Sequence, residues 1–226
     1  QYISYCRIIS KLKLDILFPS IYDLYFHYNL KKFIYEYWKD KKKYKILDNS
    51  YYFGYWHNLK YLKNLKKNIN LNLINIYLNK PKIKKFIRTK INNKTVCLHI
   101  RGGDFGTLSS HNLLDQKYYD NSISFYKKKL KNPEFHVFTN DLNFSKKILY
   151  KHLQNFKFEY VKNLKLSDIE EFSLFSTYKF SVIANSTFSL ISSFLSSKRN
   201  TNVAPKLWLK GKKLEKNKRF TKLKFI

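Results

Sequence analysis

Short apolar runs alternate with longer amphipathic stretches from about residue 94 onward, and this alternation constrains the fold more than any other feature. Four apolar runs predict strands, at residues 95–100, 134–139, 156–161 and 180–184. Stretches with helical spacing follow them, at residues 118–131, 142–153, 167–178 and 187–197. Four successive β-α units predict a parallel sheet that helices cover on both faces. The expected fold class is therefore α/β.

The first ninety residues follow a different pattern. Apolar side chains at helical spacing predict helices around residues 5–12 and 33–38. Residues 71–86 have roughly helical spacing broken by Pro81, which predicts helices that join two lobes. We therefore expect two domains, residues 1–90 and residues 91–226.

The charge of the chain has a compositional explanation. Lys and Arg number 45 and Asp and Glu 15, which gives a net charge of +30. Such a balance is typical of proteins that bind nucleic acid or an anionic membrane. However, five of these residues are Arg and the lysines are scattered among many Asn, Ile, Tyr and Phe residues, as an AT-rich genome would impose. We expect no specific nucleic-acid partner, but some attraction to anionic lipid headgroups.

The cysteines and the start of the sequence indicate the cellular compartment. Cys6 and Cys97 are too far apart in sequence to indicate a disulfide framework or a metal cluster, and a reducing compartment fits. No apolar run of about 18 residues and no signal-peptide pattern occur, so we expect a cytoplasmic protein. The chain opens without Met in what reads as the middle of an element, and we expect the natural N-terminus to be missing.

Polar residues follow three of the predicted strands. They are Arg101, Gly102, Gly103 and Asp104 after the first strand, Asn140 and Asp141 after the second, and Asn185, Ser186 and Thr187 after the fourth. Open parallel sheets bind ligands at the carboxyl ends of their strands. This edge is the candidate site.

The residue types at this edge suit a nucleotide diphosphate. The Arg101 guanidinium can pair with phosphate oxygens in bidentate fashion, and Gly102 and Gly103 let the backbone approach an anion closely. Ser186 or Thr187 can cap the following helix. Alternatively, their hydroxyls and the free N–H groups at the start of that helix can bind phosphate. Asn140 and Asp141 can form an ordinary turn or bind the edge of a base. No Asp-x-Asp sequence or metal-ligand spacing occurs, so no metal is expected.

Ordered motifs along the chain resemble one family. Residues 99–105 resemble His-x-Arg-Arg-Gly-Asp-Tyr, residues 137–141 resemble Val-Phe-Ser-Asp-Asp, and residues 183–189 match Ile-Ala-Asn-Ser-Thr-Phe-Ser. Tyr118-Tyr119, Pro205 with Trp208, residues 54–61 and Gln1-Tyr2 also fit. Taken in order, they resemble the alpha-1,2-fucosyltransferases of glycosyltransferase family 11 over nearly the whole chain.

The resemblance implies a GT-B-like fold of two Rossmann-like lobes. Residues 1–90 would form a truncated acceptor-side lobe without its first strand and glycine-rich loop, and residues 91–226 the lobe that binds GDP-fucose. The implied reaction is an inverting, metal-independent transfer of fucose to a galactose-type hydroxyl of a surface glycan, in alpha-1,2 linkage and without a cofactor. Contact with the inner face of the membrane is expected, because the lipid-linked acceptors of such pathways lie there.

The resemblance also implies residue roles. Arg101 would stabilise the β-phosphate, helped by Gly102, Gly103, Asn185, Ser186 and Thr187, while Asn140 and Asp141 would contact the guanosine. Asp104, His99 and Glu171 are the candidates for the general base. Glu171 can instead serve the ribose, and His99, in a buried strand, can simply be a core residue.

Three departures keep alternatives open. Gly102 stands where the family has a second Arg, Leu190-Ile191 replaces a pair of Trp residues, and the opening glycine loop is absent. The alternatives are a degenerate non-catalytic paralogue, a transferase for another nucleotide sugar, and a basic polyanion-binding protein.

Overall fold

A computed structural model describes the backbone of residues 32–35, 50–53, 71–103, 113–196, 201–209, 212–213 and 223–226. The chain divides into two compact units, residues 1–63 and residues 64–226. In the first unit, β1 (Lys32–Tyr35) pairs in parallel with β2 (Ser50–Phe53). The helix predicted at residues 33–38 is therefore wrong for residues 33–35, whose aromatic and β-branched side chains suit a strand. The helix predicted at residues 5–12 lies outside the described residues.

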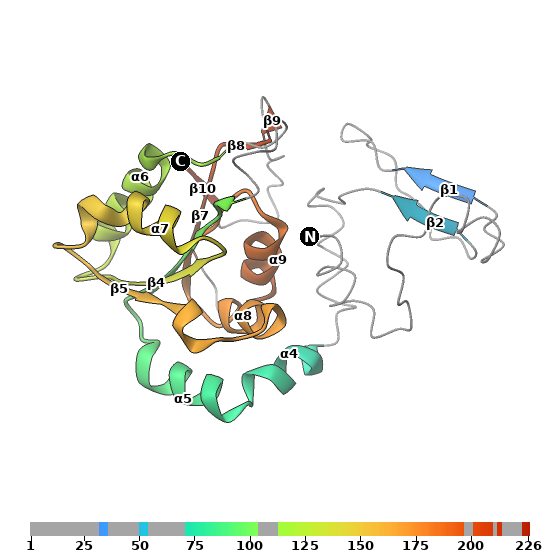
Figure 1. The fold of residues 1–226 in the computed structure, drawn as a ribbon, viewed down its shortest axis with the longest axis horizontal. Helices are drawn as coiled ribbons and strands as arrows, with labels where there is room; N and C mark the ends of the chain where they lie inside the picture. The colour runs from blue at the N-terminus through green and yellow to red at the C-terminus, as the bar shows by residue number, and fades with distance from the viewer. Residues whose placement is uncertain are drawn as a thin grey trace. The chain divides into compact units, whose positions relative to one another are not determined.

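A parallel sheet of six described strands forms the centre of the second unit (Figure 1). In chain order the strands are β3 (Thr95–Ile100), β4 (Glu134–Thr139), β5 (Lys157–Tyr160), β6 (Phe180–Val182), β7 (Thr201–Ala204) and β10 (Leu223–Phe225). The predicted parallel sheet is confirmed, with two strands more than expected. The spatial order is β10-β7-β6-β3-β4-β5. Counted from β3 as the first strand, this is the 3-2-1-4-5-6 order of doubly wound dinucleotide-binding folds.

Helices connect these strands, as predicted. They are α6 (Gln116–Lys129), α7 (Leu142–Leu149), α8 (Asp168–Phe175) and α9 (Thr187–Leu195), with the short 3-10 helices η2 (Tyr150–His152) and η3 (Val161–Leu164). A small antiparallel pair, β8 (Leu207–Leu209) and β9 (Lys212–Lys213), follows β7. None of the helices in the described part of the chain is long and apolar enough to cross a membrane.

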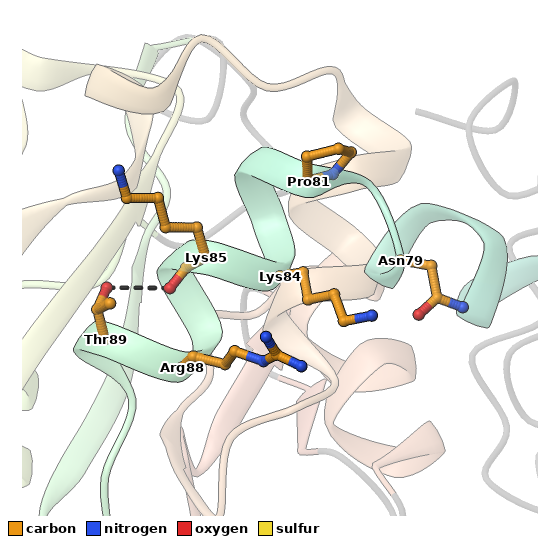
Figure 2. A pocket seen from close by; sticks show the side chains of 6 residues that line it. All are labelled: Asn79, Pro81, Lys84, Lys85, Arg88 and Thr89. Atoms are coloured by element: carbon orange, nitrogen blue, oxygen red, sulfur yellow. Dashed lines mark hydrogen bonds between the residues drawn. The ribbon is translucent and has the colours of Figure 1, made fainter.

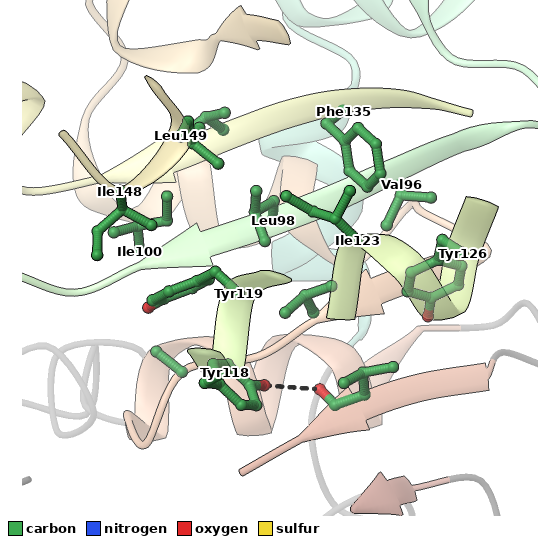
Figure 3. Packing of buried hydrophobic residues seen from close by; sticks show 14 of the residues in the cluster. Val96, Leu98, Ile100, Tyr118, Tyr119, Ile123, Tyr126, Phe135, Ile148 and Leu149 are labelled. Carbon is green, nitrogen blue, oxygen red and sulfur yellow. Dashed lines mark hydrogen bonds between the residues drawn. The ribbon is translucent and has the colours of Figure 1, made fainter. Parts of the chain in front are cut away.

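One face of the sheet packs against α6 and α7. Val96, Leu98 and Ile100 of β3 point to this face, where they meet Tyr119 and Ile123 of α6 (Figure 3). Each of these side chains is buried. Burial of a side chain of this size contributes about 1.5–3 kcal/mol, so this layer is a principal source of stability.

The opposite face carries an aromatic layer under α8 and α9. The alternate residues of β3 and β4 point here, and the ring of His99 lies 5.3 Å from that of Phe188 in α9. Phe138 of β4 packs 4.9 Å from Phe175 of α8, also measured between ring centroids. The layer fixes α8 and α9 against the strands that carry the candidate site.

Two tyrosines of α6 tie β6 to β7. The Tyr118 hydroxyl donates to the carbonyl of Ile183 at 2.6 Å, and the Tyr126 hydroxyl donates to that of Thr201 at 2.6 Å. Tyr118 and Tyr126 are eight residues apart and so lie on the same side of the helix. These bonds anchor the helix to the half of the sheet that begins with β6.

Two further helices precede the sheet, α4 (Leu71–Leu78) and α5 (Pro81–Lys90). The prediction of helices interrupted at Pro81 is confirmed, and Pro81 stands at the start of α5, where a missing N–H costs nothing. Both helices contact α8 and fall in the second unit. The division at residue 90 into an acceptor-side and a donor-side lobe stays a prediction.

Candidate functional site

The site is built where the strand order reverses. From β3 the chain winds outward to β4 and β5 on one side, and to β6, β7 and β10 on the other. The connections after β3 and β6 therefore diverge, and doubly wound sheets bind their ligands in the crevice at this point, outside the carboxyl ends of the strands. Leu98 pairs with Val182, and Arg101 and Asn185 each lie three residues beyond that pair. The topology thus brings Arg101, Gly102 and Gly103 together with the predicted site residues that follow β6.

The turn after β3 requires both of its glycines. A Cβ on Gly102 would lie 2.8 Å from the ring of Phe144 and 3.0 Å from the Cβ of Asp141. Gly103 has a φ of +61°, the left-handed conformation that glycine adopts without strain. The packing at Gly102 also gives a physical reason for the departure from the family motif, because an Arg side chain here would need the start of α7 to move.

Asn140 holds this turn in place. Its side-chain oxygen accepts from the Gly102 N–H at 3.0 Å, and its amide group donates to the Gly102 carbonyl at 3.2 Å. The two bonds join the end of β4 to the residue that follows Arg101. Asn140 was predicted to contact a base, but its contacts here position the turn, a role that sequence alone did not reveal. The signal available was only that both residues follow neighbouring strands.

Asp141 caps α7. Its carboxylate accepts from the Phe144 N–H at 2.9 Å, and its own N–H donates to the Thr139 hydroxyl at 3.0 Å. This is the turn that the sequence left open as an alternative to base binding. The capping bond uses one acceptor position of the carboxylate, so the group can still accept hydrogen bonds from a nucleotide.

The N-terminus of α9 lies at the crevice and has no side-chain cap. Ser186 is the N-cap residue and its side chain makes no capping bond, unlike Asp115 and Asp141 at the starts of α6 and α7. The first N–H groups of a helix carry partial positive charge and point outward, which makes them suited to an anion. Thr187 is the first residue of the helix and is half-buried. The side chain of Ser186 therefore takes no capping role, and its role toward phosphate stays a prediction.

Asn185 links two motifs that are separated in sequence. It is buried, and its side-chain amide donates to the backbone carbonyl of Trp208 at 3.0 Å. The resemblance had pointed to Asn185 and Trp208 separately. The bond between them shows that Asn185 holds the chain that follows β7, at Trp208.

His99 lies within the aromatic layer. It is 5% exposed, and burial, reinforced by the positive charge of Arg101, lowers its pKa to about 3. Its ring contacts Phe175 and Phe188. The imidazole is therefore neutral and weakly basic at neutral pH, which favours the core role over the general-base role.

Glu171 has a raised pKa. It lies in the first turn of α8. The residue after it, Phe172, packs against Phe188 in the first turn of α9, with 5.8 Å between the ring centroids. Burial, reinforced by the charge of Asp168 and opposed by that of Lys162, raises the pKa of Glu171 to about 7. A carboxyl group that titrates near neutral pH beside a crevice can exchange a proton or accept a hydrogen bond from a ligand.

Asp104, the other predicted base, lies outside the described residues. Within the described ranges no three His, Cys, Asp or Glu side chains converge as a metal site would require. Tyr119 was predicted only as a motif residue, and its hydroxyl donates to the His99 carbonyl at 3.4 Å. It therefore supports the strand end that carries Arg101.

The strand order and the polar residues at its reversal define an α/β unit of the doubly wound class. The family model for glycosyl transferase family 11 matches residues 11–224, and the chain belongs to this family. A curated relative, an alpha-1,2-colitosyltransferase of Escherichia coli, is 31% identical over 102 residues. The match covers 42% of this chain and 34% of the relative, so the chain spans about a third of that relative's length.

Proposed function

We propose that this protein transfers a sugar from a nucleotide sugar to a hydroxyl group of a glycan, with the donor bound at the carboxyl edge of the parallel sheet. Membership of glycosyl transferase family 11 supports the class of reaction. One observation carries the position of the donor. Arg101 and the uncapped N-terminus of α9 follow the two strands between which the order reverses. A diphosphate needs a bidentate cation and several N–H donors, and this edge supplies both.

The proposed donor is GDP-fucose. The ordered motifs of the chain support a fucosyl group, whereas the name of the Escherichia coli relative specifies a colitosyl group. We take fucose as the first candidate and colitose as the second, with an alpha-1,2 linkage in either case. The carboxylate of Asp141 is proposed to contact guanine and Glu171 the ribose, while Asn140 acts by holding the turn.

In the proposed reaction the acceptor oxygen attacks the anomeric carbon of the donor and inverts its configuration. The bond from that carbon to the β-phosphate oxygen breaks, and its electron pair leaves with GDP. Arg101 and the N–H groups of α9 stabilise the charge that develops on the phosphate, which makes the reaction metal-independent. The acceptor proton passes to Asp104, which we prefer to His99 because the latter is buried and weakly basic.

We also propose a setting for the reaction. The chain would contribute to a GT-B arrangement in which the segment before the sheet binds the acceptor. It would work in the cytoplasm, against the anionic inner face of the membrane. The net charge of +30 supports that contact, because basic residues are attracted to anionic lipid.

A non-catalytic paralogue is the second candidate. The packing of Phe144 and Asp141 around Gly102 favours it, because this packing leaves no space for the family's second Arg. Such a protein would keep the fold but would no longer catalyse the transfer.

Calorimetric titration of the full chain with GDP, GDP-fucose and UDP tests the proposal, together with a transfer assay. We expect guanine-selective binding, and a loss in rate on the order of 100- to 1000-fold for Arg101→Ala. Lys127→Ala, at an exposed position of α6, is the control, because it removes a basic side chain that lies outside the candidate site. A folded protein that binds GDP no better than UDP would contradict the proposed donor. Guanine-selective binding without transfer would favour the paralogue.

A further inference from the structure

A second candidate ligand site lies on the outer side of α5. It is a pocket of about 450 Å³ (Figure 2), lined by Asn79, Pro81, Lys84, Lys85, Arg88 and Thr89. None of these residues belongs to the carboxyl-edge site. The proposed transferase reaction therefore gives the pocket no role.

Three donor groups gather on one side of this pocket. Lys84 and Arg88 are four residues apart on α5, so their side chains are neighbours on the helix surface. Figure 2 shows both extending toward the side where the Asn79 amide lies, whereas Lys85 extends to the other side of the helix. The Thr89 hydroxyl donates to the Lys85 carbonyl at 3.0 Å and is thereby occupied. The converging groups are thus one guanidinium, one ammonium and one amide.

The charges of Lys84 and Arg88 are not neutralised within the described part of the chain. Neighbouring lysines are engaged: Lys80 pairs with Glu170 at 2.7 Å and Lys90 with Glu159 at 3.3 Å, measured from nitrogen to oxygen. Lys82 donates to the Leu164 carbonyl. By contrast, no acidic residue lines the pocket, and no described carboxylate forms an ion pair with its two converging cations. The pocket therefore offers positive charge to an external anion.

The presence of an arginine narrows the class of anion. The chain has five Arg among its 45 basic residues. Among the described residues they are Arg88 and Arg101, and both lie in candidate anion sites. A guanidinium presents parallel N–H donors that match two oxygens of one phosphate, which an ammonium group cannot do.

We propose that this pocket binds a phosphate group, with Arg88 as a bidentate donor and Lys84 and Asn79 as single donors. Phospholipid headgroups and soluble phosphate esters carry the same chemistry, and the test separates these two sources. The proposal is independent of the transferase function, since it shares no residue with the donor site.

The test uses the full chain in two arms. In the first, inorganic phosphate and pyrophosphate are titrated while the side-chain Nε signal of Arg88 is followed by NMR. In the second, sedimentation measures binding to vesicles of phosphatidylcholine with and without phosphatidylglycerol. The variants are Lys84→Gln/Arg88→Gln, which removes both charges, and Arg88→Lys, which keeps the charge and loses the bidentate geometry. Lys127→Gln/Lys128→Gln removes the same charge from exposed positions of α6, on the opposite face of the sheet.

We expect saturable binding whose affinity falls about tenfold or more in the α5 double variant. The affinity should also fall clearly in Arg88→Lys, and it should not change in the α6 control. A response to free phosphate or pyrophosphate identifies a soluble ester as the source. A response confined to vesicles with the anionic lipid identifies a headgroup. Equal losses in the two double variants would mean diffuse charge and would overturn the site, as would no binding in either arm. Titration of each variant with GDP keeps this outcome separate from any failure of the donor site.

Discussion

Gly102 shows at the residue scale how closely the site is packed. A methyl group there would lie within 3.0 Å of both Phe144 and Asp141, so either α7 or the turn must move. We expect Gly102→Ala to lower the free energy of unfolding by about 1–3 kcal/mol, the usual cost of overpacking. Urea unfolding followed by circular dichroism measures this change. Ser124→Ala, at an exposed position of α6, is the control and should change stability by less than about 0.5 kcal/mol. Equal stability of the two variants would show that the turn adapts.

Glu171 gives a pH dependence whose sign follows from its environment. Its pKa is raised from 4.5 to about 7, chiefly by burial, so the folded state holds a proton that the unfolded state releases. The free energy of unfolding therefore falls as pH rises from about 4.5 to 7, and this loss is absent in Glu171→Gln. We expect the stability of Glu171→Gln relative to the parent protein to increase across this window. NMR of the Glu171 carboxyl carbon should titrate near pH 7, and a midpoint near 4.5 would contradict the assignment.

At the scale of elements, Asn140 connects the ends of β3 and β4. Its two bonds to Gly102 predict that Asn140→Ala loosens the turn that carries Arg101. We expect the affinities for GDP and UDP to fall by the same factor, about tenfold, which corresponds to about 1.4 kcal/mol for the two bonds. Calorimetric titration with both nucleotides measures this. A loss confined to GDP would instead support the base-binding role predicted from sequence.

The elements also show which parts of the fold the sequence could predict. Both β3 and β4 were predicted to the residue, because strands buried on both faces are continuous apolar runs. Both β7 and β10 were missed, since they are short and stand in Lys- and Asn-rich sequence that gives no apolar run. The helix predicted at residues 33–38 is wrong for residues 33–35, because aromatic residues fit either period in so short a segment.

The candidate site was predictable in its position but not in its contacts. Arg101 and Ser186 could be placed at one edge, because parallel strands end on the same side of a sheet. The bond of Asn140 to Gly102 and that of Asn185 to Trp208 could not be predicted, because they join residues 38 and 23 positions apart. The core role of His99 was foreseen as an alternative, but the aromatic rings around it were not, because they come from α8 and α9.

For the whole molecule, the residues of the proposed donor site all belong to one of the two compact units. The site residues, the sheet and the helices that cover it all fall within residues 64–226. We expect residues 64–226 alone to fold and to bind GDP with an affinity within about threefold of the full chain, or about 0.7 kcal/mol. Circular dichroism and calorimetry of the shortened protein measure both properties. Transfer to an acceptor should be lost in this protein, and GDP affinity that falls with it would place donor-binding groups in the first unit.

The hydrogen bond from Asn185 to the Trp208 carbonyl connects a tryptophan, whose fluorescence can be measured, to the candidate site. Trp208 is fully buried, whereas the chain's other two tryptophans, Trp38 and Trp56, belong to the first unit. With those two replaced by Phe, the fluorescence would come from one indole that is shielded from water. The backbone carbonyl of the same residue, Trp208, accepts a hydrogen bond from Asn185, the residue before Ser186. The indole emission should lie at short wavelength and resist quenching by iodide. Binding of a ligand at the N-terminus of α9 should then change the fluorescence of Trp208, so that binding can be followed without a label.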